Sequence, residues 1–85
     1  MLLSRYVACV GELLIDFVCS DTGTDLSQGE HFIKKAGGAP ANVACAISRL
    51  GGQAKLAAKV GNDPFGEFLI DTVKAEGVDV TSVIK

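Results

Sequence analysis

Apolar residues open the chain in two runs that predict β-strands. The first run, residues 6–10 (YVACV), has no polar position and ends at Gly11, which is typical of a strand buried on both faces. The second run spans residues 13–19 and is broken only by Asp16. Residues 20–30 are mostly polar, which indicates a loop or hairpin connection before a brief return to strand character at residues 31–33.

A helix and a third long strand are predicted next. Pro40 lies near the first helical position, and Val43, Ile47 and Leu50 recur at helical spacing before a Gly-Gly stop. Since almost every face of this helix is apolar or small, we expect it to be buried on most sides. Residues 54–60 alternate between apolar residues and lysines, which predicts a strand with one solvated face.

The last part of the chain predicts a capped helix and a final strand. Asp63 and Pro64 form an N-cap and first-turn pair, and Gly77 ends the helical pattern. Its apolar positions are Phe65, Phe68, Leu69 and Val73. Residues 78–84 have strand character.

This order of strands and helices predicts an α/β fold with a parallel sheet that helices cover on both faces. Two helices are too few for that arrangement, because buried parallel strands need helices on each side. We therefore expect the 85 residues to be the first part of a larger fold.

Composition narrows the class of protein. With 48% hydrophobic and 21% charged residues, the chain is too apolar to be intrinsically disordered. A net charge of −2 offers no basic surface for nucleic acid, and charged residues interrupt the apolar runs before the length of a membrane span is reached. Cys9, Cys19 and Cys45 are widely spaced within apolar runs, so we expect buried, reduced thiols in a cytoplasmic protein, with no disulfide framework and no metal site.

Asp16 is the first candidate for chemistry. A carboxylate inside an apolar run is costly if it is buried without a partner, so it must reach solvent, a donor or a ligand. Two interpretations are open. Asp16 either faces water or caps a turn at a strand end, or it lies in a cleft at the carboxyl end of a strand and accepts hydrogen bonds from the hydroxyls of a polyol.

Residues 37–42 (GGAPAN) are the second candidate. Gly37 and Gly38 before a helix N-terminus let a ligand approach the backbone, and Asn42 in the first turn can both donate to and accept from a sugar hydroxyl. The segment matches neither G-x-x-x-x-G-K-[ST] nor G-x-G-x-x-G, and on the glycines alone a plain turn with a helix cap is favoured.

The remaining polar positions have simpler interpretations. Residues 61–66 (GNDPFG) fit a strand-to-helix turn, and Lys34 with Lys35 fits a solvated strand end before the glycines. His31 is the single histidine, and no Ser/His/Asp or Cys/His set can be assembled.

Taken in order, these motifs resemble the amino-terminal part of a ribokinase-like (PfkB-type) carbohydrate kinase. Residues 11–16 (GELLID) resemble the family's first strand and its sugar-binding aspartate. Residues 37–42, with the spacing of the later glycines, fit its amino-terminal signature. Residues 61–66 and 76–78 (EGV) continue the pattern, so the resemblance covers nearly all of the chain.

Departures from the ribokinase pattern bear on the sugar. Ala39 and Pro40 replace a Lys-Gly pair that is typical of ribokinases, and Leu14 stands where they carry asparagine. Both departures make the chain more similar to fructokinases, so the resemblance implies fructose or a related sugar as substrate. A nucleoside kinase or a 2-keto-3-deoxygluconate kinase of the same family is the alternative, as is a non-catalytic sugar-binding or assembly module.

The resemblance also implies a fold and a set of site residues. Residues 1–85 would form the amino-terminal part of a three-layer α/β/α kinase domain, with about 17–36 belonging to a small β-sheet lid inserted after the first strand. Asp16 would bind sugar hydroxyls beside Gly38 and Asn42, with Gly37 shaping the turn. In many relatives the lid also joins two subunits, which makes a homodimer through the lid the expected assembly.

The family's reaction is ATP-dependent phosphoryl transfer to a sugar hydroxyl. Its catalytic base and glycine-rich anion hole belong to a Gly-Ala-Gly-Asp motif near the carboxyl end, and this chain has no such motif. The resemblance therefore implies that ATP, Mg and the catalytic residues are held outside this chain. We expect the 85 residues to carry the sugar-binding half-site and to be inactive alone.

Overall fold

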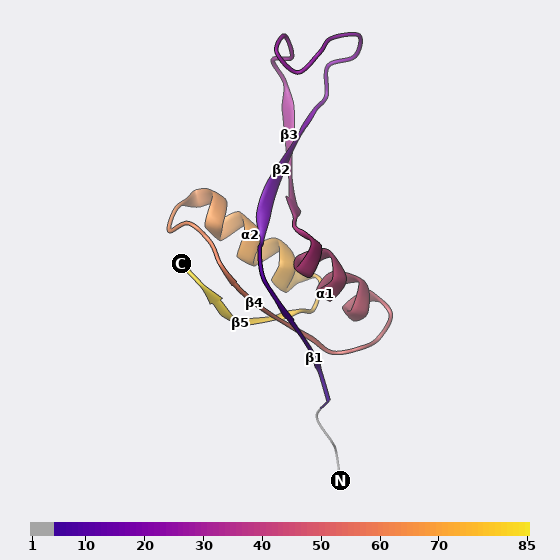
Figure 1. The fold of residues 1–85 in the computed structure, drawn as a ribbon, viewed down its shortest axis with the longest axis vertical. Coiled ribbons are helices and arrows are strands. Elements are labelled where there is room, and N and C mark those ends of the chain that lie inside the picture. Colours follow the sequence, from indigo (N-terminus) through magenta and orange to yellow (C-terminus); the bar gives the residue numbers. More distant parts are fainter. Residues whose placement is uncertain (1–4) are drawn as a thin grey trace.

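The computed structural model describes residues 5–85, which form a three-stranded sheet, two helices and a projecting hairpin (Figure 1). The hairpin extends away from the sheet, so the molecule measures 57 × 28 × 18 Å. The elements in chain order are β1 (Val7–Val10), β2 (Leu14–Cys19), β3 (Phe32–Gly37), α1 (Ala39–Arg49), β4 (Ala54–Lys59), α2 (Pro64–Ala75) and β5 (Asp79–Ile84).

The sheet has the strand order β1-β4-β5, and all three strands are parallel. The chain returns from β1 to β4 through α1 and from β4 to β5 through α2, stepping in the same direction each time. Right-handed crossovers of this kind lay both helices on one face of the sheet. The predicted α/β fold with parallel strands is confirmed.

The core lies between this face of the sheet and the two helices. Both the strands and the helices contribute side chains to this core. The largest of the fully buried side chains are Leu56 of β4 and Val73 of α2. Its ten members are Cys9, Leu13, Ala41, Ala44, Ala54, Leu56, Val60, Leu69, Val73 and Val78.

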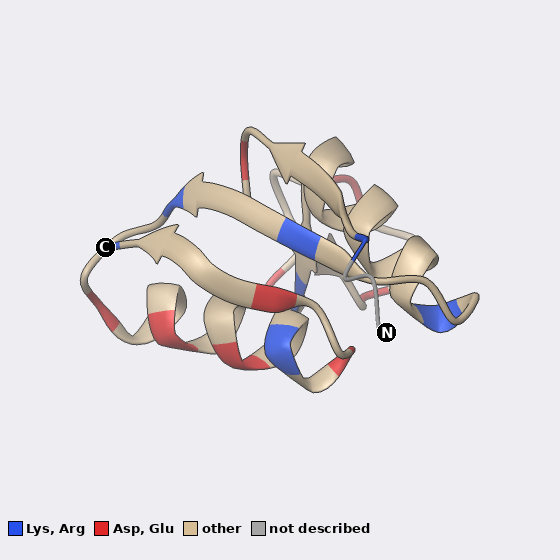
Figure 2. Cartoon of the chain, turned by 90° about the horizontal axis from the view of Figure 1, so that it is seen from below, with Lys and Arg blue, Asp and Glu red and all other residues tan. Residues whose placement is uncertain are grey.

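The other face of the sheet carries no helix within residues 5–85. Tyr6 and Lys55 share this face, with the Lys55 ammonium 5.8 Å from the Tyr6 ring centroid. Val10 of β1 is 74% exposed, so the prediction that this strand is buried on both faces is wrong for the described chain. The predicted alternation of residues 54–60 is confirmed: Leu56 is buried, whereas Lys55 is half-buried and Lys59 is exposed. The lysine positions of β4 are blue on the ribbon of Figure 2.

The helix α1 is less buried than its composition predicts. Ala41 and Ala44 face the sheet, but Val43 is 51% exposed and Leu50 is 88% exposed. The prediction of burial on most sides is wrong, because within the described residues α1 has a sheet on one side only. The apolar composition of α1 does not show whether a second layer covers its outer face.

The helix α2 begins and ends as predicted. The Asp63 carboxylate accepts a hydrogen bond of 2.8 Å from the backbone N–H of Gly66, which caps the first turn. Gly77 follows the last turn with a φ of +89°, a conformation that favours glycine. Of the four apolar positions, Phe65 is an exception, since it is half exposed and lies outside the core.

The strands β2 and β3 form a separate antiparallel pair, in register from Leu14 opposite Gly37 to Cys19 opposite Phe32. Residues 11–16 therefore do not belong to the first strand: β1 ends at Val10, and Asp16 lies on β2. The two apolar runs on either side of Gly11 predict this division correctly, and it is the assignment of residues 11–16 to the family's first strand that is wrong. The hairpin contains the segment 17–36 that the resemblance assigns to a lid, but its paired strands begin and end slightly outside it.

Candidate functional site

Asp16 and Gly37 meet at the base of the hairpin. Asp16 lies within β2 and is exposed, and its carboxylate leans diagonally across the hairpin toward Gly37 of β3. A Cβ atom at position 37 would overlap Oδ2 of Asp16. Glycine at this position therefore makes room for the carboxylate, which a plain turn would not require.

Gly38 leads directly into α1 and is its N-cap residue. Its φ of +103° favours glycine, and a Cβ atom there would lie 2.7 Å from the backbone carbonyl oxygen of Glu12. Among the described residues no side chain caps this helix. The positive end of the α1 dipole is thus open next to the Gly37 backbone that Asp16 contacts.

Asn42 lies one turn into α1, and its backbone N–H donates to the Gly38 carbonyl oxygen at 2.9 Å. Its side chain borders a cavity of about 530 Å³ that lies between α1, α2 and β3. Asp16, Gly37 and Gly38 do not line this cavity. The structure thus brings three of the four predicted site residues together and leaves Asn42 beside them, on the cavity side of the helix.

The opposite face of the hairpin packs against α2. Ile15 and Ala36 reach the core, and the Phe17 ring meets the Phe65 ring edge-to-face, with centroids 6.0 Å apart. Phe65 therefore contacts the hairpin, which explains why it lies outside the core. The Lys34 ammonium lies 4.3 Å from the ring centroid of Phe68, so Lys34 belongs to this face as well.

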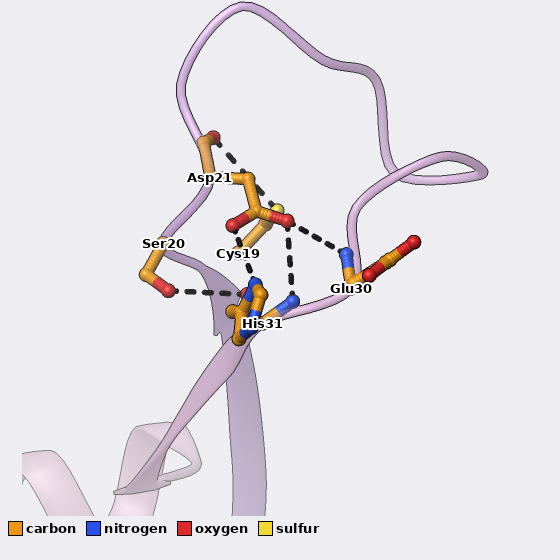
Figure 3. A network of polar contacts seen from close by, with 5 residues as sticks. All are labelled: Cys19, Ser20, Asp21, Glu30 and His31. Atoms are coloured by element: carbon orange, nitrogen blue, oxygen red, sulfur yellow. Dashed lines mark hydrogen bonds and ion pairs between the residues drawn. The ribbon is translucent and has the colours of Figure 1, made fainter.

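The far end of the hairpin is closed by a polar network around Asp21 (Figure 3). The Asp21 carboxylate accepts a 2.7 Å hydrogen bond from the Glu30 backbone N–H and a 3.2 Å bond from that of His31, and it contacts Nδ1 of the His31 ring at 2.9 Å. His31 therefore holds the loop closed, a role that the sequence did not reveal. His31 lies eleven residues after Ser20 and ten after Asp21, and this spacing matches no known motif.

Among the groups whose pKa is shifted, Asp21 belongs to the hairpin and Cys45 to the cavity. The Glu30 backbone N–H, followed by the contacts of His31, holds the pKa of Asp21 below its ordinary value, because these donors favour the charged carboxylate. Burial, together with the nearby Glu76 carboxylate, raises the pKa of the Cys45 thiol. This raised pKa disfavours the nucleophilic thiolate form of Cys45.

The predicted burial of the cysteines is correct for Cys9 only. Cys19 and Cys45 are partly buried, and all three are free thiols. Within residues 5–85, no three His, Cys, Asp or Glu side chains are grouped closely enough to hold a metal ion. Neither helix of the described chain has the length and hydropathy that a membrane crossing requires.

Lys34 and Lys35 are both solvent-exposed, as predicted, but neither lies at a strand end. Both lie within β3, where Lys35 is directly opposite Asp16. The pairing of Lys35 with Asp16 follows from the register in which Leu14 lies opposite Gly37. The sequence alone does not give that register.

Comparison with known proteins gives a consistent result. The family model described as "pfkB family carbohydrate kinase" matches residues 4–85. Fructokinase-2 of Oryza sativa subsp. japonica is 51% identical over 73 residues, which are 86% of this chain and 22% of that protein.

Two solved structures illustrate the similarity of the folds. The sugar kinase PH1459 of Pyrococcus horikoshii, solved in complex with ATP, has a TM-score of 0.87 and 51% identity over 92% of this chain and 26% of its own. A fructokinase of Vibrio cholerae O395 with bound fructose, ADP and calcium has a TM-score of 0.77 and 40% identity over 93% of this chain and 23% of its own. The chain thus spans about a quarter of the length of the relatives it matches, over a segment of the ribokinase-like fold. The 85 residues belong to the pfkB family of carbohydrate kinases.

Proposed function

We propose that the whole protein transfers the γ-phosphoryl group of ATP to a hydroxyl of a neutral sugar, with fructose as the preferred substrate. The fructokinases among its relatives support this choice, as does the relative from Vibrio cholerae, whose structure contains fructose and ADP. The departures from the ribokinase pattern at Leu14, Ala39 and Pro40 point in the same direction.

In this proposal the chain supplies the sugar-binding half of the site. The observation that supports it best is the Asp16 carboxylate lying against Gly37, beside the uncapped N-terminus of α1. Asp16 would accept hydrogen bonds from sugar hydroxyls, Gly37 and Gly38 would let the sugar approach the backbone, and Asn42 would offer an amide that both donates and accepts. Binding of this kind orients the hydroxyl for in-line attack.

ATP and Mg²⁺ are part of the proposal, but none of the described residues is assigned to hold them. The chain lacks the Gly-Ala-Gly-Asp motif, and its described residues contain no group of metal-ligating side chains. When bound, ATP supplies the phosphoryl group and Mg²⁺ offsets its charge. The proposed task of residues 5–85 is therefore to bind and orient the sugar, not to carry out the chemical step.

An assay of ADP release by the full-length protein with fructose, ribose and 2-keto-3-deoxygluconate tests the function. Fructose is expected to give the highest kcat/KM, and no ADP release with any sugar would refute the proposal. The variant Asp16→Asn keeps the shape of the side chain but removes its charge. It is expected to raise KM for fructose about tenfold or more, since hydrogen bonds to charged groups are the strong ones.

We also propose that two copies of the protein join through the hairpin and that the protein is cytoplasmic. Large apolar side chains remain exposed on both hairpin faces, Val18 and Ile33 on one and Phe17 and Phe32 on the other, and a second copy would cover one of these faces. The three free thiols support a reducing compartment. Sedimentation of the full-length Phe32→Ser variant tests the assembly: the dimer is expected to weaken, and an unchanged dimer would exclude this face.

A further inference from the structure

A lysine stands beside the proposed sugar-binding aspartate. In the register of the hairpin, Lys35 of β3 is the direct cross-strand partner of Asp16 of β2. Directly opposed residues in an antiparallel pair project from the same face, with Cβ atoms about 5 Å apart. Lys35 and Asp16 therefore share one face of the hairpin.

The side chain of Lys35 projects to the other face of β3 from that of Lys34, although both residues border the cavity between α1, α2 and β3. Neighbouring residues on a strand project to opposite faces, and Lys34 is on the α2 side, where its ammonium lies over the Phe68 ring. Lys34 thus has a structural partner. Lys35 is exposed, and neither Lys35 nor Asp16 has a side-chain hydrogen bond or ion pair to another residue of the described chain.

The Asp16 carboxylate and the Lys35 ammonium are thus neighbours of opposite charge, and neither is bonded to another side chain within residues 5–85. A ligand that both donates and accepts hydrogen bonds can bind to the two groups together. Each sugar hydroxyl can donate one hydrogen bond and accept others. A sugar can therefore donate to the carboxylate from one hydroxyl and accept from the ammonium at the next. Resting on the function proposed above, we infer that Lys35 is a second sugar-contacting residue, which donates to a hydroxyl oxygen next to the one that Asp16 binds.

The same pairing bears on the class of substrate. The positive charge of Lys35 is balanced by Asp16, and the carboxylate of Glu12 belongs to the segment that passes beside Gly38. The surroundings thus hold no excess of positive charge, which favours a neutral polyol over a sugar acid. Lys35 acts here as a hydrogen-bond donor to hydroxyls and not as an anion receptor.

The test compares Lys35→Met with Lys34→Met in the full-length protein. Both substitutions keep a long apolar stem and remove one ammonium group. Lys35→Met is expected to raise KM for fructose about tenfold with kcat nearly unchanged, because it removes one hydrogen bond from a charged donor. Lys35→Arg is expected to restore most of the affinity, and Lys34→Met is expected to leave KM for fructose within about twofold.

The outcomes separate this inference from the proposed function. If the unaltered protein phosphorylates no sugar, the proposed function fails. If it phosphorylates fructose and Lys35→Met keeps KM within about twofold of the unaltered protein, the role of Lys35 is refuted while the function stands. An effect of Lys35→Met confined to 2-keto-3-deoxygluconate would refute the hydroxyl contact and make Lys35 a carboxylate receptor.

Discussion

Replacing Gly37 by alanine tests whether the position of the Asp16 carboxylate matters. The added methyl group would occupy the space of Oδ2 of Asp16, so the carboxylate must turn away from α1. The φ angle of Gly37 lies outside the left-handed region, so the substitution adds no backbone strain and its effect comes from the carboxylate. Losing one or two hydrogen bonds from a charged acceptor corresponds to about 10- to 100-fold in KM for the sugar.

A double-mutant cycle with steady-state kinetics on the full-length protein provides the control. If Gly37→Ala acts by displacing Asp16, it should have almost no further effect in an Asp16→Ala background. Gly51→Ala is a useful comparison, because it introduces strain at a φ of +90° where no atom lies within 4 Å of the new Cβ. Additive effects of Gly37→Ala and Asp16→Ala on KM would show that the two residues act separately.

Three further predictions concern stability. Asp63→Ala removes the cap of α2 and is expected to lower the free energy of unfolding by about 1 kcal/mol in urea titrations of the full-length protein, whereas an unchanged midpoint would mean that the cap contributes nothing. Leu56→Ala leaves a cavity in the core and should cost about 2–5 kcal/mol, and a loss below about 1 kcal/mol would contradict the observed enclosure of this side chain. The pKa of Asp21 is lowered in the folded state, so its stabilisation of the hairpin loop is present at neutral pH and disappears as pH falls through that lowered pKa. The NMR shift of the Glu30 amide should report this titration below about pH 4 and should become insensitive to pH in Asp21→Asn; an amide that does not respond at all in the unaltered protein would exclude the bond.

Local signals in the sequence predicted the elements that depend on near neighbours. Asp63 and Pro64 mark the start of α2 because capping involves residues three positions apart. The alternation around Leu56 gave the orientation of β4, since one face of that strand is buried and the other is not.

The errors concern partners that lie far away in sequence. Val10 is exposed because no layer of the described chain covers its face, and no pattern within an apolar run reveals the presence of a second layer. The pairing of Asp16 with Lys35 depends on the register of β2 and β3, which is set by contacts nineteen positions apart. For the same reason the helical spacing of Phe65 does not reveal that this ring packs against Phe17.

The anchoring of the hairpin at its base has a mechanical consequence. A strand of six residues is about 20 Å long, so a rotation of about 10° at the base carries the far end of the hairpin through about 3.5 Å. The contacts of Phe17 with Phe65 and of Lys34 with Phe68 join the middle of the paired strands to the first turns of α2. A small rotation at the base would therefore be amplified at the tip, and any such rotation would also displace these contacts with the two aromatic rings.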